Sequence, residues 1–409
     1  MFLSELFFPH GRGAELATYL YAKTLSNAGT KIIVVTNRFG REPDCSKEPN
    51  LTIYRIPMFK KSDGNKYSIL QRSDLLLSSS VRKVFQWADI IYIPRFWFSA
   101  IPLARTWGKP VVVHIHDYIP VCPLATICDI SKRKVCSSNG LICSGKCIYT
   151  FEKGQGRSFP EALLSLALNS TFGRVFCRLV RLSDAVIFVS NAQRTLITER
   201  LPTLGSKSRV IYNPLPDISR MSTEGDDFGY FGGGDPLKGF GTLYDALNCI
   251  NHHQKQITVH ATGFFDYERR RPDLLEFARI RYYPRLHSPI FEQLYKRIRA
   301  VIVPSLLPEP LPYVVSEAIL RGRAVVASNV GGIPEQVEGC KASYLFKAGN
   351  HSELAEKMQY VGELSEETVE DLTMHDREVL TKRFSVDKAI GDFLNVCHQA
   401  KENHIIRKD

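Results

Sequence analysis

The sequence lacks any apolar stretch approaching the ~20 residues that a membrane-spanning helix needs. It has no run of basic residues interleaved with aromatic ones, which a nucleic-acid platform would need, and no internal repeat. The chain opens with MFLSELFFPHG, without the basic segment and cleavage site of a signal peptide. These absences argue against an integral membrane protein and a nucleic-acid-binding protein. We expect a cytoplasmic protein that can also sit at the inner face of the membrane.

Composition and charge indicate the kind of protein and the kind of partner that it binds. The 409 residues are 44% hydrophobic and 23% charged, values typical of ordinary globular proteins. Single cores stop growing near ~250–300 residues, so this length predicts two domains. The net charge of +11 and the pI of about 9.1 indicate an anionic partner, for which nucleotide diphosphates and anionic lipid headgroups both qualify.

Residues 301–335, VIVPSLLPEPLPYVVSEAILRGRAVVASNVGGIPE, predict a strand, a proline-rich loop, a helix closed by Gly322, a second strand and a Gly331-Gly332 turn. Such βαβ units bind ligands in the loops beyond the carboxyl ends of their strands. Two acids mark this unit, because Glu309 lies in the loop and Glu317 lies in the helix, with seven residues between them. One acid can therefore face the distal end of a ligand and the other its proximal end.

The ordered motif resembles the E-x7-E region of glycosyltransferase family four, whose members are retaining, nucleotide-sugar-dependent enzymes of the GT-B fold. Around the two acids, Pro304-Ser305, Gly322 and residues 331–335 stand where that family has them. The resemblance covers roughly residues 8–395. It implies an α/β fold of GT-B architecture, with two doubly wound Rossmann-like domains that face each other across a cleft holding the active site.

The resemblance also assigns roles in the second domain. Glu309 is expected to hold the donor sugar and steady developing positive charge, and Glu317 to hold the nucleotide ribose. Backbone amides at the start of the helix, from Leu311, Tyr313 and Val314, are expected to bind the diphosphate, where the helix dipole favours an anion. No metal or cofactor is expected to be required, since lysine and helix dipoles neutralise the charge.

The sequence departs from the family pattern at two places. Leu311-Pro312 replaces the usual Phe-Gly pair after the first acid, and a proline has no amide to donate. Lys238 resembles the family's phosphate-binding lysine, but Gly233 stands where an arginine is usual. Arg12 is therefore our candidate for the second cation on the donor phosphates.

In the first half of the chain, the loop Gly11-Arg12-Gly13-Ala14-Glu15 precedes an amphipathic helix and resembles the family's Gly-Gly-Ala-Glu loop. A glycine loop at a helix N-terminus can cradle a diphosphate, so Gly13 and Ala14 are predicted to contact the donor, although a purely structural turn is the alternative.

The predicted strand KPVVVHIHD places two histidines on one face, because side chains two apart in a strand point the same way. His116-Asp117 resembles the family's His-Asp element, where the imidazole lies near the reactive end of the donor sugar. We predict a catalytic role for His116 and a core role for His114.

Five of the ten cysteines fall in a loop spanning residues 122–147: Cys122, Cys128, Cys136, Cys143 and Cys147. No C-x2-C pair occurs, and the spacings are irregular. Free thiols, a structural zinc site using Cys136, Cys143 and Cys147, and disulfides all stay open as interpretations.

The predicted domains are residues 1–215 on the acceptor side, a linker at 216–227, a nucleotide-sugar-binding domain at 228–385, and a helix at 386–409 that packs back on the first domain. Within the first domain, residues 159–182 form an apolar helix pattern that carries arginines. Such a helix can lie on an anionic membrane surface or be a core helix with its arginines extended into solvent.

The proposed reaction transfers a sugar from a nucleotide diphosphate sugar to an acceptor hydroxyl with retention of configuration. A glycan or lipid-linked acceptor from cell-envelope, glycolipid or glycan biosynthesis fits the basic charge. The alternatives are a GT-B sugar epimerase or sugar-phosphate-type synthase, and a non-catalytic nucleotide-sugar-binding scaffold.

Overall fold

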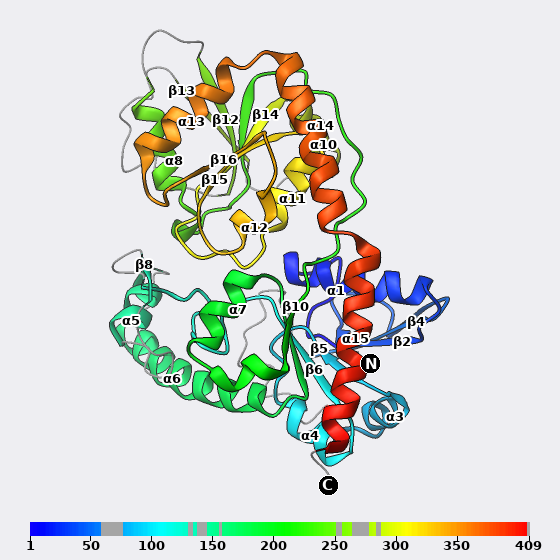
Figure 1. The fold of residues 1–409 in the computed structure, drawn as a ribbon. Helices are drawn as coiled ribbons and strands as arrows, with labels where there is room; N and C mark the ends of the chain where they lie inside the picture. Colours follow the sequence, from blue (N-terminus) through cyan, green and yellow to red (C-terminus); the bar gives the residue numbers. More distant parts are fainter. Residues whose placement is uncertain are drawn as a thin grey trace. The chain divides into compact units, whose positions relative to one another are not determined.

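The computed structural model describes residues 1–58, 77–129, 134–136, 145–154, 158–250, 256–263, 278–283 and 288–406. The chain divides into two compact units (Figure 1). The first contains residues 1–127, 137–214 and 384–409, and the second contains residues 128–136 and 215–383.

The first unit is built on an eight-stranded sheet with the order β10-β9-β6-β5-β1-β2-β4-β3. All neighbouring strands pair in parallel except β3 with β4. The strands are β1 (Phe2–Leu3), β2 (Ile32–Asn37), β3 (Cys45–Glu48), β4 (Leu51–Ile56), β5 (Ile91–Ile93), β6 (Val111–Ile115), β9 (Ala185–Phe188) and β10 (Ser208–Val210). The helices are α1 (Gly13–Asn27), α3 (Ser79–Trp87), α4 (Ala100–Thr106), α5 (Gly145–Gly154), α6 (Phe159–Arg181), α7 (Asn191–Thr198), the 3-10 helix η2 (Pro202–Lys207) and α15 (Val386–Ile406).

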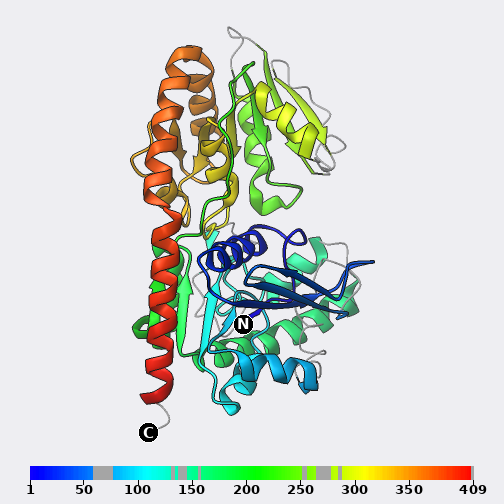
Figure 2. The same ribbon diagram turned by 90° about the vertical axis from the view of Figure 1, so that its right-hand side faces the viewer.

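Strand alternation in β6 builds a core on each face of this sheet. Val111 and Val113 pack into a cluster with residues of α3, α4, α6 and α7, whereas Val112 packs into a cluster with residues of α1 and α15. Figure 2 shows α15 as a long helix beside the first sheet, consistent with its contacts to β6 and β9. Helices thus cover both faces, which is the doubly wound arrangement predicted from the sequence.

The second unit contains a fully parallel sheet with the order β13-β12-β11-β14-β15-β16. Helices α8 and α13 lie on one face, and α10, α11 and α14 lie on the other (Figure 1). The strands are β11 (Asp227–Tyr230), β12 (Ile257–Thr262), β13 (Ala278–Tyr283), β14 (Ile298–Val303), β15 (Ala324–Ser328) and β16 (Ser343–Phe346). The helices are the 3-10 helix η3 (Pro236–Lys238), α8 (Phe240–Asn248), α10 (Ser288–Arg297), α11 (Tyr313–Leu320), α12 (Ile333–Val337), α13 (His351–Glu363) and α14 (Glu366–Arg383). This second doubly wound sheet confirms the predicted α/β class.

A short hairpin from the cysteine-rich loop belongs to the second unit by its contacts. It pairs β7 (Cys128–Asp129) with β8 (Lys134–Val135) in antiparallel fashion. Cys128 is buried in a cluster with Leu237 and Leu307, which lie next in sequence to Lys238 and two residues before Glu309. The hairpin therefore packs under two loops that carry predicted site residues.

Arg323 ties residues 221–223 to the second unit. Its buried guanidinium donates to the carbonyl oxygens of Met221 and Ser222 and to Thr223 Oγ1, each at 2.9 Å. A buried cation is tolerated only when its donors are paired, and these acceptors, with the Tyr295 carbonyl at 2.9 Å, supply that pairing. The segment that enters β11 is thereby held against β15.

Two glycines with positive φ bring the site loops of the second unit together. A Cβ at Gly331 (φ +55°) would overlap the backbone of Glu309, and the Gly332 amide donates to the Glu309 carbonyl oxygen at 2.8 Å. A Cβ at Gly239 (φ +81°) would overlap the carbonyl oxygen of Pro304. Both positions require glycine for its left-handed conformation and for the close backbone approach.

We expect Gly331→Ala to lower the free energy of unfolding by about 2–4 kcal/mol, because it adds a strained φ to an overlap with backbone. Gly349→Ala is the matched control. Gly349 also has a positive φ (+78°), but its Cβ would meet only a Leu306 methyl at an ordinary 3.6 Å, so it should cost only about 1–2 kcal/mol. Denaturant unfolding followed by circular dichroism measures both, and equal losses would contradict the close-approach explanation.

Candidate functional site

In the second unit, the residue predicted to bind phosphate and the residue predicted to bind sugar are paired with each other. Lys238 Nζ lies 2.6 Å from Glu309 Oε1, and Ser305 Oγ donates to the same oxygen at 2.6 Å. Glu309 is buried while about a third of the Lys238 side chain is exposed. A buried carboxylate is held here by one cation and one hydroxyl, and the cation is open to solvent on its other side.

Each member of this trio is positioned by local structure. Ser305 and Glu309 lie in the loop after β14. The backbone of the Gly331 turn packs closely against the backbone of this loop at Glu309. Lys238 ends η3, and the Leu306 amide donates to the Leu237 carbonyl oxygen at 2.8 Å, which fixes the two loops together. The site thus sits at the carboxyl ends of β11 and β14, where α/β sheets bind ligands.

Glu317 lies on α11 in an electrostatic setting of its own. Burial raises the pKa of its carboxyl, and the nearby Arg321 partly offsets this rise. Arg321 Nη1 is 3.7 Å from Glu317 Oε2, while its Nη2 is 3.0 Å from Glu292 Oε1 and its guanidinium lies over the ring of Tyr295. Arg321 is shared, so its ion pair with Glu317 is long, and the Glu317 carboxylate keeps acceptor capacity for a hydroxyl donor.

The start of α11 supplies the amides predicted for the diphosphate. Pro312 is the N-cap residue and Tyr313 is the first helical residue, followed by Val314. First-turn amides of a helix point toward its positive end and lack intrahelical acceptors. Leu311 precedes the helix in the loop, and its side chain is buried.

Gly233, where the family usually has an arginine, has φ +72°. Nothing lies within 4 Å of where its Cβ would be, so space does not exclude a side chain there. The left-handed backbone does disfavour one, because only glycine adopts it without strain.

The glycine loop of the first unit is organised around a buried acid. Gly13 begins α1, followed by Ala14, and the exposed Arg12 donates its backbone amide to Glu15 Oε2 at 2.6 Å. A Cβ at Gly11 would overlap the Glu15 side chain, which explains the glycine at φ +102°.

Arg95 joins this loop to the end of β1. Its Nε lies 2.9 Å from Glu5 Oε1, and its Nη1 forms an ion pair with Glu15 Oε1. Both carboxylates are almost fully buried. Burial raises the pKa of Glu5, and the Arg95 charge counteracts part of this.

His114 of β6 and His116, which follows the strand, share one face, as predicted. Their ring centroids are 4.1 Å apart, and His114, fully buried, contacts Tyr92 Oη through Nδ1 at 2.7 Å. Burial, together with the Arg95 charge, lowers the pKa of His116 to about 3, so its imidazole is neutral at physiological pH. A neutral ring can donate from one nitrogen and accept at the other. His114 has the surroundings of a core residue, and His116 stands at the end of the strand, where a ligand can reach.

Sequence reasoning missed Ser305, Arg95 and Glu5 as members of these clusters. Glu5 lies two residues after β1, and an acid just after the carboxyl end of a parallel strand is a usable signal. Arg95 follows β5 in the same way. Their pairing was not readable, because it joins residues about ninety positions apart.

The structure bears on the three interpretations of the cysteine-rich loop, which are free thiols, a structural zinc site and disulfides. Nine cysteines lie in the described part of the chain, and none of these forms a disulfide. No group of three potential ligand side chains that could hold a metal ion occurs among the described residues. Cys143 lies outside the described residues, so a zinc site that uses Cys136, Cys143 and Cys147 stays a prediction. The loop YYPRLHSP (residues 282–289) is where the family resemblance implies that the nucleotide base binds, and its residues 284–287 also lie outside the described part.

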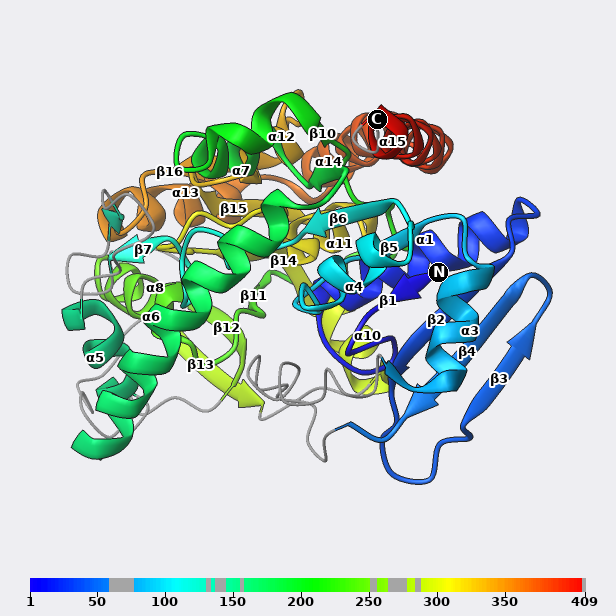
Figure 3. The same cartoon turned by 90° about the horizontal axis from the view of Figure 1, so that it is seen from below.

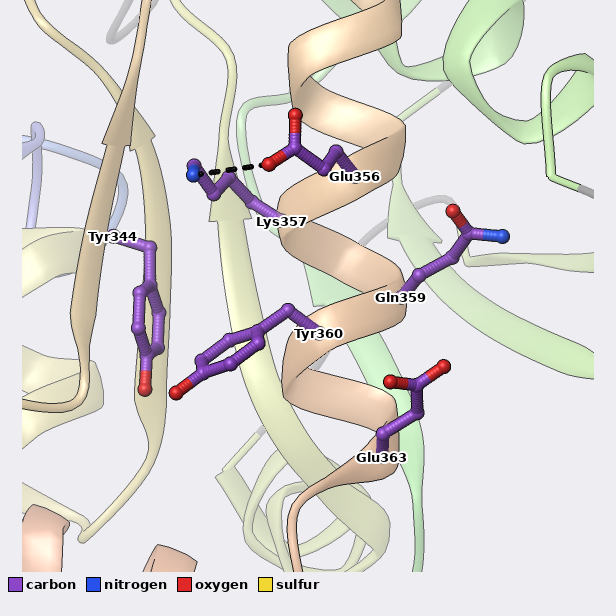
Figure 4. Close-up of a pocket in the computed structure, with 6 residues that line it drawn as sticks. All are labelled: Tyr344, Glu356, Lys357, Gln359, Tyr360 and Glu363. Atoms are coloured by element: carbon purple, nitrogen blue, oxygen red, sulfur yellow. Dashed lines mark hydrogen bonds and ion pairs between the residues drawn. The ribbon is translucent and has the colours of Figure 1, made fainter.

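A pocket of about 490 Å³ in the second unit is unrelated to the motif residues (Figure 4). Its lining comes from the outer side of α13 and from one tyrosine of β16: Glu356, Lys357, Gln359, Tyr360, Glu363 and Tyr344. Neither Lys238, Glu309 nor Glu317 contributes to it. Sites of doubly wound sheets lie at strand ends, so the motif, and not this pocket, marks the functional region.

The structure therefore brings Lys238, Glu309 and Glu317 into the second unit and places Arg12, Gly13, Ala14 and His116 in the first. None of the helices in the described ranges has the length and apolar content that a membrane crossing requires.

Several solved structures superpose on nearly the whole of this chain and share its fold. The Anabaena protein HepE, solved in complex with UDP-glucose, superposes with a TM-score of 0.63 at 20% identity, over 96% of this chain and 98% of that one. Sucrose-phosphate synthase from Thermosynechococcus elongatus gives 0.69 at 15% identity, over 97% and 98%. A glycosyltransferase from Rickettsia africae gives 0.60 at 16% identity, over 98% of both chains. No curated protein sequence is significantly similar to this chain.

Two family models match the sequence. Residues 225–363 match the model for glycosyl transferases group 1, which spans the Lys238, Glu309 and Glu317 motifs. Residues 11–217, just over half of the chain, match the model for Glycosyltransferase Family 4. The chain is thus a glycosyltransferase that belongs to glycosyltransferase family 4.

Proposed function

We propose that this protein transfers a sugar from a nucleotide diphosphate sugar to an acceptor hydroxyl with retention of the anomeric configuration. The observation that carries the proposal is the Lys238–Glu309 pair, with its 2.6 Å separation, beside the N-terminus of α11. A nucleotide sugar places an anionic diphosphate directly beside a hydroxyl-bearing ring. An ammonium adjacent to a buried carboxylate complements both parts of that molecule.

In this proposal Lys238 exchanges its contact with Glu309 for the donor diphosphate. The freed Glu309 oxygen then accepts hydrogen bonds from sugar hydroxyls, while Ser305 keeps the carboxylate oriented. As the bond from sugar to phosphate breaks, negative charge grows on the departing nucleotide. Lys238 and the amides of Tyr313 and Val314 are positioned to stabilise that charge without a metal ion.

Glu317 is proposed to bind the ribose hydroxyls, supported by its position one turn into α11 and its retained acceptor capacity. His116 is proposed to act at the reactive end of the sugar as a neutral hydrogen-bond donor, together with donor contacts from Gly13 and Ala14. UDP-glucose is the first donor to test, because HepE binds it. A glycan or lipid-linked acceptor is proposed from the basic charge of the chain.

The proposal is tested first by thermal unfolding of the full chain with UDP-, GDP- and ADP-sugars. A donor at a hundred times its Kd should stabilise the protein by about 2.7 kcal/mol. Glu317→Ala should bind that donor about 10- to 100-fold more weakly, through loss of charge-assisted hydrogen bonds. Glu356→Ala, on the outer side of α13, is the control and should bind normally.

Failure of every nucleotide sugar to stabilise the protein would contradict the proposed donor class. Binding without transfer or hydrolysis would instead favour the scaffold alternative, and interconversion of the donor sugar would favour the epimerase.

A second prediction concerns Arg12, which we propose as a cation for the donor phosphates because Gly233 has no side chain. Arg12→Ala should weaken donor binding about tenfold or more, the effect of losing a charge-assisted hydrogen bond. Arg41, an exposed arginine of the same unit, provides the control Arg41→Ala. Unchanged donor affinity and turnover in Arg12→Ala would remove this role.

Retention gives a third prediction. The proton NMR coupling of the anomeric centre, recorded early in the reaction, should show the same configuration in the product as in the donor. An inverted product would leave the transferase assignment intact but contradict the proposed retention, since inversion needs a general base that activates the acceptor on the opposite face of the ring.

A further inference from the structure

Helices α5 and α6 of the first unit lie side by side (Figure 3). Together they expose a cluster of large apolar side chains. Phe159, Leu163 and Leu164, in the N-terminal half of α6, are 67%, 55% and 62% exposed. Tyr149 of α5 extends the cluster, with its ring centroid 6.2 Å from that of Phe159. Single exposed leucines are common, but four neighbouring large apolar side chains mark a contact surface.

The C-terminal half of α6 is basic. Arg174, Arg178 and Arg181 are all exposed. The only acidic residue of the helix is Glu161, which is already used at the N-cap, where Ser158 donates to it from N at 2.8 Å and from Oγ at 2.7 Å. The helix therefore carries three exposed arginines in its C-terminal half and one acid at its N-terminal end.

The apolar and basic residues lie on one side of α6. At 3.6 residues per turn, positions 159, 163, 164, 174, 178 and 181 fall within an arc of roughly 140°. The opposite side is buried: Ala162, Phe176 and Val180 pack toward the sheet, and Phe176 stacks edge-on against Phe98 at 5.5 Å. A single flat partner can thus contact the whole exposed side, which is roughly 35 Å long.

We propose that this side of α5 and α6, defined by Tyr149, Phe159, Leu163, Leu164 and the three arginines, docks on a bilayer that contains anionic phospholipid. A lipid surface offers both required chemistries in one plane, acyl chains for the apolar half and phosphate groups for the arginines. A nucleic acid would leave the leucines without a partner, and an apolar protein groove would leave the arginines unmatched. The surface is independent of the donor site, so the two proposals can fail separately.

The experiment is co-sedimentation of the full chain with vesicles of phosphatidylcholine alone or mixed with phosphatidylglycerol. The protein should bind the mixed vesicles more tightly. Leu163→Ser with Leu164→Ser should weaken partition into both kinds roughly tenfold or more. Arg178→Gln with Arg181→Gln should weaken binding to the anionic vesicles by a factor of roughly 25, about fivefold per arginine, and leave the neutral vesicles unaffected.

Matched controls remove the same groups elsewhere. Ile405→Ser with Ile406→Ser deletes two apolar side chains that are 61% and 72% exposed on α15, and Arg41→Gln with Lys83→Gln deletes two exposed charges. Both controls should bind vesicles like the unchanged protein, and the unfolding midpoints of all variants should agree.

Three outcomes would overturn the proposal. The protein could stay unbound with both kinds of vesicle, or the α6 variants could bind as the controls do. Alternatively, the leucine pair could change the oligomeric state in solution without affecting vesicle binding, which would assign the surface to a second copy of the chain.

Discussion

The burial of the Glu309 carboxylate is the constraint on which the second unit depends. A buried carboxylate is stable only with a counter-charge and hydrogen-bond donors, and Lys238 and Ser305 supply them. To bring these groups together, the loops after β11 and β14 must touch at the backbone level. Gly239 makes that approach sterically feasible, and Gly331 does the same for the loop after β15, which meets the backbone of Glu309. The chemistry of the ligand site and the packing of three loops therefore depend on the same contacts.

The first unit also buries carboxylates, but it balances their charge in another way. Glu5 and Glu15 are both buried, yet a single guanidinium serves them, so the cluster is one positive charge short of neutral if both acids ionise. The raised pKa of Glu5 relieves part of that imbalance. The same guanidinium helps to keep His116 neutral. Arg95 thus lowers the pKa of two groups, Glu5 after β1 and His116 after β6, although burial is the larger influence on both. Its ion pair with Glu15 also makes it a positioning residue for the glycine loop.

Much of this could be predicted from the sequence, because the signals were local. Branched apolar runs predicted the strands, and the motif at 309–317 with Lys238 predicted the ligands of the second unit. The contacts among these site residues were not predictable. The Lys238–Glu309 pair joins residues 71 positions apart, and it depends on the conformations of two loops. Gly233 was seen as a missing arginine, but only its φ of +72° explains why a side chain is disfavoured there.

The pattern on α6 shows why helical periodicity alone left two interpretations open. The sequence predicts an amphipathic helix with arginines, and such a helix can be a core element or an interfacial one. The structure separates the two sides: the small and aromatic residues Ala162 and Phe176 are buried, whereas Leu163 and Leu164, between them in sequence, are exposed. A core helix would bury these leucines, because burial of a large apolar side chain contributes about 1.5–3 kcal/mol. Their exposure, next to arginines on the same side, is the observation on which the proposed interfacial role rests.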